Sequence, residues 1–82
     1  MPIRYEASTA FFEGACAPEE ALELIEWLRE RKRPKVNLKA CEHLHTAILQ
    51  VLLALRPPLS ERPDDPFLAA WVAPLLRVGN DQ

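Results

Sequence analysis

The amino-acid sequence predicts a small α/β domain in which about three helices cover a short mixed sheet. Near the N-terminus, residues 3–8 alternate between apolar and polar side chains with the period of a half-buried strand. Residues 18–33 then have the pattern of an amphipathic helix, and a short apolar strand follows at residues 36–38. Because a helix that joins two neighbouring strands forms a crossover, these strands are expected to be parallel.

The length and composition of the chain limit what kind of protein it is. Its 82 residues suit one domain, 1–82, and its hydrophobic fraction of 49% is that of a folded protein. A net charge of −2, without a basic stripe interleaved with aromatic residues, argues against nucleic-acid binding. No apolar run approaches the roughly 20 residues that span a bilayer, and the N-terminus lacks the apolar core of a signal peptide. The two cysteines fit free thiols in a reducing compartment, so we expect a cytoplasmic protein without membrane insertion.

The first predicted element is a strand pattern over residues 3–13. Ile3 and Tyr5 lie on one side of it, with charged residues between them, and Gly14 ends it. No Asn-Gly or Asp-Gly pair marks a hairpin turn within this segment. The pattern therefore leaves open one bent strand or a tight hairpin, and it predicts one or two short strands in the same sheet.

Residues 18–33 form the clearest helix pattern. Pro18 suits the first helical position, and the two glutamates that follow it are favoured by the helix dipole. The apolar stripe of this helix consists of Ala21, Leu24, Ile25 and Leu28. A basic run at residues 29–33 closes the helix and Pro34 stops it. We expect the helix to lie on the sheet with its charged face in solvent.

Residues 36–55, VNLKACEHLHTAILQVLLAL, are the stretch around which the chain is expected to be organised. A strand at 36–38 leads through a polar turn at 39–45 into a helix at 46–55 that is apolar around most of its circumference. Such a helix is expected to be buried on most sides. The turn then lies at the carboxyl edge of the sheet, where open α/β sheets bind ligands and partners.

The C-terminal part of the chain differs from the predicted strand-helix-strand-helix core at residues 3–55. Residues 56–66 contain four prolines and no periodicity, which predicts a stiff linker. Asp64 or Asp65 can cap a third helix within residues 67–77, with Trp71 as its largest anchor.

This order of elements resembles the STAS domain, the fold of bacterial anti-sigma factor antagonists and of sulfate-transporter cytoplasmic domains. In that family a strand reads roughly V-x-D-L-S, and D-S-x-G-L stands at the start of the following helix. Here V-N-L-K at 36–39 lies on the strand, H-T-A-I-L at 45–49 lies at the helix start, and E-G at 13–14 is similar to the E-G that closes an earlier strand. The resemblance covers roughly residues 3–55 and implies an interaction partner, such as a kinase-type anti-sigma factor.

The sequence also departs from the pattern of this family. His45 stands at the family's aspartate, Thr46 at its phosphorylatable serine and Ile48 at its glycine. After the second helix the family has a further parallel strand, where this sequence predicts the proline-rich linker. The resemblance implies that Thr46 is phosphorylated by a partner kinase, while the pattern of the residues favours Thr46 as a simple helix cap.

Cys41, His43 and His45 form a C-x-H-x-H cluster of side chains that bind zinc or copper. A zinc site needs a fourth ligand, which Cys16 supplies only if the fold brings it near. A thiol-based small enzyme is a further alternative, although no glycine-rich oxyanion loop accompanies the cluster. The interpretation we favour is that Cys41 is a small buried residue and that the histidines lie at the surface.

The sequence therefore predicts a non-catalytic, cytoplasmic protein-interaction module of a bacterial regulatory or signalling system, with no cofactor. The alternatives are a phospho-switched antagonist that uses Thr46, and a metal or thiol site built on Cys41, His43 and His45. The apolar surface of the second and third helices suggests a homodimer or a permanent partner. The residues predicted to contact the partner are Cys41, His43, His45, Thr46, Ala47 and Gln50.

Overall fold

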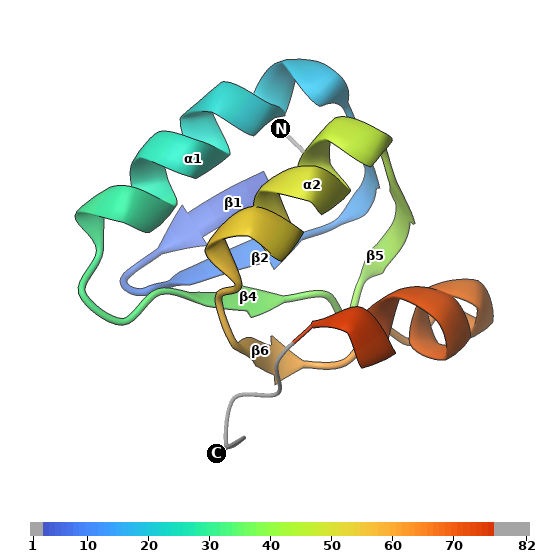
Figure 1. Cartoon of the computed structure of the whole chain (residues 1–82). Helices are drawn as coiled ribbons and strands as arrows, with labels where there is room; N and C mark the ends of the chain where they lie inside the picture. Colours follow the sequence, from blue (N-terminus) through green and yellow to red (C-terminus); the bar gives the residue numbers. More distant parts are fainter. Residues whose placement is uncertain (1–2, 77–82) are drawn as a thin grey trace.

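The computed structural model describes residues 3–76 and shows a compact α/β domain (Figure 1). The strands are β1 (Ile3–Glu6), β2 (Thr9–Phe12), β3 (Gly14–Cys16), β4 (Lys35–Asn37), β5 (Cys41–Leu44) and β6 (Leu59–Glu61). The helical elements are η1 (Pro18–Glu20), α1 (Ala21–Glu30), α2 (Thr46–Leu55), η2 (Leu68–Val72) and η3 (Ala73–Leu75). We call the continuous helical segment 66–75, which includes η2 and η3, the C-terminal helix. The predicted fold class, a mixed sheet with about three helices, is confirmed.

The main sheet has the strand order β1-β2-β4-β6. β1 and β2 are antiparallel, whereas β4 pairs in parallel with both β2 and β6. Figure 1 shows α1 and α2 side by side across one face of this sheet. α1 lies in the connection from β2 to β4, and α2 lies in the connection from β4 to β6. Both connections join parallel strands and advance in the same direction across the sheet, so the right-handed crossover rule places both helices on the same face.

The N-terminal segment is a tight hairpin, which decides between the two alternatives that the sequence leaves open. Glu6 pairs with Thr9, so the loop consists of Ala7 and Ser8 alone. Ala7 has a φ of 49°, in the left-handed region that two-residue hairpin loops require. The turn lacks the usual asparagine or glycine, which is why the sequence does not reveal it.

A second, two-stranded sheet continues the first. After Glu13 the chain bends at Gly14, whose φ of 66° suits glycine, and β3 then pairs in parallel with β5. The Gly14 N–H donates to the Ala40 carbonyl at 2.9 Å, which fixes the start of this pair. The predicted polar turn at residues 39–45 is therefore wrong, because only Lys39 and Ala40 turn and Cys41–Leu44 form a strand.

The segment after α2 also contains a strand that the sequence does not predict. α2 itself spans the predicted residues 46–55 and ends at Arg56, whose left-handed backbone donates its N–H to Leu52. Where a stiff linker is expected at residues 56–66, Leu59–Glu61 form β6 and extend the sheet beside β4. Three residues with one apolar side chain are too few to show a strand period.

The core lies between the main sheet and its two covering helices. α1 buries Leu24, Trp27 and Leu28, and α2 buries Ile48, Val51 and Leu52. They pack against sheet residues that include Ala10, Phe12, Val36 and Leu59. The predicted stripe of α1 is thus buried at Leu24 and Leu28, while its other two members are half-buried.

The C-terminal helix is capped at its start as predicted, but the face that it buries is not the predicted one. Asp65 accepts a hydrogen bond from the Leu68 N–H at 3.1 Å and so caps the helix. Its buried side chains are Leu68, Val72, Ala73 and Leu76, whereas Trp71 is 69% exposed. The prediction that Trp71 is the anchor is therefore wrong. Two apolar stripes run along this helix, and its π-helical turns bury the stripe that contains Leu68 and Val72. None of the described helices is long and apolar enough to cross a membrane.

Candidate functional site

The junction of β5 and α2 is built around His45. Its N–H donates to the Cys16 carbonyl at 3.3 Å, which ties the junction to β3. Its Nδ1 accepts a hydrogen bond from the Ala47 N–H at 3.0 Å, so the imidazole caps α2. His45 therefore performs the role that the sequence assigns to Thr46. A neutral imidazole has one nitrogen that accepts, which makes this substitution for an ordinary cap possible.

Thr46 is consequently the first residue of α2 rather than its cap. Its side chain is exposed and takes part in no hydrogen bond with any residue between 3 and 76. The hydroxyl lies at the N-terminal end of the helix, where backbone N–H groups and the helix dipole favour negative charge. The site can therefore accept a phosphate or an acidic group of a partner without breaking a bond within the domain.

The six predicted contact residues fall into two sets. His43, His45, Thr46 and Gln50 are exposed and Ala47 is half-buried. Cys41 is only 1% exposed, so its side chain is part of the core and does not belong to a contact surface. This burial agrees with the favoured interpretation of Cys41 as a small buried residue.

Cys41 instead forms a thiol pair with Cys16, which is equally buried on the neighbouring strand β3. Cys41 Sγ donates a hydrogen bond to the carbonyl oxygen of His43 at 3.6 Å. The neighbouring Cys41 thiol and burial together raise the pKa of the Cys16 thiol. A protonated, buried thiol is a poor nucleophile and a poor metal ligand.

The structure does not bring the C-x-H-x-H cluster together. Cys41 points into the core, His43 is exposed, and the Nδ1 of His45 is bound to the backbone of α2. Across residues 3–76, no group of three histidine, cysteine or acidic side chains converges in a way that would hold a metal ion. Cys16 does lie close to Cys41, but no third metal-binding side chain among residues 3–76 joins the pair.

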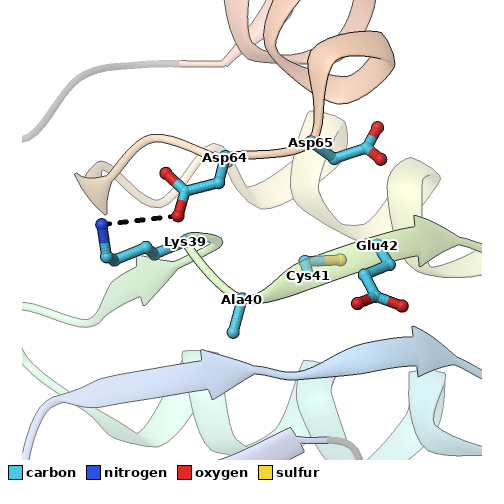
Figure 2. A pocket seen from close by; sticks show the side chains of 6 residues that line it. All are labelled: Lys39, Ala40, Cys41, Glu42, Asp64 and Asp65. Carbon is cyan, nitrogen blue, oxygen red and sulfur yellow. Dashed lines mark ion pairs between the residues drawn. The ribbon is translucent and has the colours of Figure 1, made fainter.

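A pocket of about 450 Å³ lies beside the start of β5 (Figure 2). Its lining consists of Lys39, Ala40, Cys41, Glu42, Asp64 and Asp65. Figure 2 shows that the three carboxylates point in different directions, and that Asp64 faces Lys39, with 3.5 Å between the Lys39 Nζ and Asp64 Oδ2. The Asp64 N–H also donates to the Lys39 carbonyl. These contacts join the start of the C-terminal helix to the sheet. The residues around this pocket therefore serve to hold the helix in place.

A second hollow, of about 390 Å³, lies between α1 and α2 and is predominantly apolar. Its lining consists of Ala21, Ile25, Arg29, Ala47, Gln50, Val51, Ala54 and Leu55, which we call the interhelical groove. It includes two of the predicted contact residues, Ala47 and Gln50. Sequence reasoning missed the side formed by α1. The sequence signal for the groove is the small residues Ala47 and Ala54 near Gln50, because they form a narrow face on an otherwise bulky apolar helix.

Comparisons with protein-family models, curated proteins and solved structures find no match for this chain. Inferences about its function therefore depend on the residues and their geometry.

Proposed function

We propose that this protein is a non-catalytic, cytoplasmic protein-interaction module of a bacterial regulatory or signalling system, similar to an anti-sigma factor antagonist. The observation that carries the proposal is the start of α2, where His45, Thr46 and Gln50 are exposed beside an apolar groove. The reactive side chains of the same stretch are sequestered, since the Cys41 thiol is buried against Cys16. An exposed surface of uncharged side chains next to an apolar hollow supports the binding of a protein partner.

The surface at the start of α2 is suited to binding because its backbone is rigid. His45 holds the first turn of α2 through hydrogen bonds in three directions: to Cys16, to Ala47 and, through its carbonyl, to the N–H groups of Ile48 and Leu49. A preorganised surface loses little conformational entropy when a partner binds.

Site-specific photo-crosslinking in the native host tests this function. A photoreactive residue at Gln50 is expected to give a discrete protein adduct. The matched control is the same residue at Glu6, which is exposed on β1. An adduct at Gln50 and not at Glu6 supports the proposal, whereas no adduct at Gln50, or the same adduct from both positions, contradicts it.

A second candidate function is a phospho-switch at Thr46. It is supported by the finding that His45, and not Thr46, caps α2, which leaves the Thr46 hydroxyl exposed and unbonded among the described residues. A phosphate there adds charge where the helix dipole stabilises it and changes the surface that a partner contacts. Incubation with the cognate kinase is expected to label the wild type and the Ser60→Ala control but not Thr46→Ala. Absence of label in the wild type eliminates this candidate.

We also propose that the domain forms a homodimer through its C-terminal helix. Phe67, Trp71 and Leu75 recur every fourth residue and are 65%, 69% and 49% exposed. A contiguous apolar stripe of this kind is unusual on a monomer. Sedimentation is expected to show a dimer that Trp71→Glu dissociates, while a wild-type monomer at high concentration contradicts the proposal.

A further inference from the structure

The interhelical groove continues into a basic surface at the C-terminal ends of α1 and α2. A neighbouring pocket is lined by Lys32, Arg33, Pro34, Lys35, Leu55, Arg56, Pro57 and Pro58. Leu55 lines both hollows, so the apolar groove and the basic pocket adjoin each other. We call Arg29, Lys32, Arg33 and Lys35 the basic end of the groove.

The four cations of the basic end have no acidic partner among residues 3–76. Within the described residues none of them forms an ion pair, and no acidic residue lines either hollow. Arg31, which lies among them in sequence, is used differently: it donates to the Ala7 carbonyl and stacks over the Trp27 ring. The basic end is therefore a concentration of uncompensated positive charge, which favours a negatively charged partner.

The apolar part of the groove is a hollow of about 390 Å³ with small residues on both of its sides. Ala21 on α1 and Ala47 and Ala54 on α2 are small, so the surface between the two helices is hollowed. Leu22, which lies next to Ile25 on the helix surface, is 68% exposed and extends the apolar rim. Grooves with an apolar floor and a charged rim bind amphipathic helices, whose apolar face fills the floor.

We propose that the interhelical groove binds an amphipathic helix of a partner protein, with acidic residues of that helix against Arg29, Lys32, Arg33 and Lys35. This inference rests on the proposed interaction function and specifies the chemistry of the partner. The groove residues Ala47 and Gln50 belong to the predicted contact surface, so one bound helix can contact both the start of α2 and the basic end.

Charge and shape favour this occupant over two others. An anionic membrane also attracts basic residues, but a flat surface would also approach the exposed glutamates of η1 and α1 at positions 19, 23, 26 and 30, which line neither hollow and are repelled by such a surface. A second copy related by a two-fold axis through the groove would place a concave groove against the same concave groove, which leaves the floor unfilled. A convex helix fills it.

The first experiment uses a designed helical peptide of about 18 residues, five turns, with a leucine and alanine stripe flanked by glutamates. The matched control peptide carries lysine at every glutamate position. Titration into the isotopically labelled domain is expected to shift amide signals of residues 21–29 and 47–55. We expect the acidic peptide to bind at least about tenfold more tightly than the basic one, and its affinity to fall as salt is added.

Charge-reversal variants then test the basic end. Lys32→Glu combined with Arg33→Glu is expected to weaken the acidic peptide about tenfold and to restore binding of the basic peptide. Arg62→Glu, an exposed cation that lies outside both hollows and forms no ion pair within residues 3–76, is the matched control and should leave both affinities unchanged. Equal affinity for the two peptides, or shifts confined to other residues, overturns the inference. So does a homodimer that buries the groove, or a domain that binds phosphatidylserine vesicles through residues 21–29 but not the acidic peptide.

The same variants separate this inference from the proposed function. If the Gln50 crosslink to a native partner is lost in Lys32→Glu/Arg33→Glu and kept in Arg62→Glu, both the proposed function and this inference stand. If the crosslink persists unchanged in both variants, the interaction function stands and the acidic-helix inference is overturned. If Gln50 gives no crosslink, the proposed function fails, and peptide titration still decides the chemistry of the groove.

Discussion

Two neighbouring regions of the chain, β5 and the start of α2, have opposite roles. β5 begins with Cys41, whose thiol is buried against Cys16 and joins the two strands of the smaller sheet. Five residues later Thr46 is exposed and makes no hydrogen bond within the described chain. The comparison shows that the thiols of this stretch serve the fold, while Thr46 and Gln50 close by in sequence lie at the surface. Substitutions should therefore affect stability in one region and binding in the other.

The largest expected effect is on the reactivity of the thiols. Because the side chains of Cys16 and Cys41 are both buried, alkylation in the native state requires local opening. We expect iodoacetamide to label the native domain at least about a thousandfold more slowly than the unfolded chain. Mass spectrometry over time measures both rates. Rapid labelling of either cysteine in the native state would contradict the structural role and revive the thiol-based alternative.

The second effect separates two positions on α2 itself. Ile48 is fully buried and Gln50 is exposed, although they lie only two residues apart. Ile48→Ala is expected to lower the free energy of unfolding by about 2–4 kcal/mol through the lost apolar burial and the cavity. Gln50→Ala should change it by less than about 0.5 kcal/mol. Urea denaturation of both variants gives the comparison, and similar losses would show that Gln50 is not a surface residue.

A smaller effect is expected at His45, which lies between the two regions. His45→Ala removes the acceptor for the Ala47 N–H and should cost about 1 kcal/mol. His45→Asn provides another capping side chain and is expected to recover most of the loss. Thermal unfolding of the three proteins tests this. If asparagine is no better than alanine, the imidazole does not act as a cap.

The smallest effect on stability is expected at Thr46, where the effect on binding should be large. Thr46→Ala removes a hydroxyl that bonds to no described residue, so unfolding should shift by less than about 0.5 kcal/mol. Thr46→Glu adds a charge to the proposed contact surface and is expected to change the yield of the Gln50 crosslink. Quantified adducts from wild type and both variants measure this. An unchanged yield would remove Thr46 from the contact surface.

The sequence predicted those parts of the fold that have long and regular patterns. The bounds of α2 were predicted because ten uncharged, mostly apolar residues are followed by Arg56 and two prolines. α1 has a clear amphipathic stripe and a proline at each side. By contrast β6 was missed because three residues carry no period, and the hairpin was left undecided because Ala7 gives no signal of its positive φ.

The candidate site was only partly visible for a different reason. Its α2 residues are contiguous in sequence, but the groove also needs Ala21, Ile25 and Arg29, which only the packing of α1 beside α2 brings near. Histidine is an uncommon helix cap, so only the structure reveals that His45 and not Thr46 caps α2. The direction in which the C-terminal helix faces was likewise undetermined, because both of its stripes are apolar.

The most direct test of the contact surface uses the partner that the Gln50 crosslink identifies. Amide spectra of the labelled domain are recorded with and without that partner, and the shifted signals are mapped on the structure. The account predicts changes at residues 45–50 and along the interhelical groove, with the core strand β4 unaffected. Changes confined to the C-terminal helix or to the β1–β2 hairpin would contradict it.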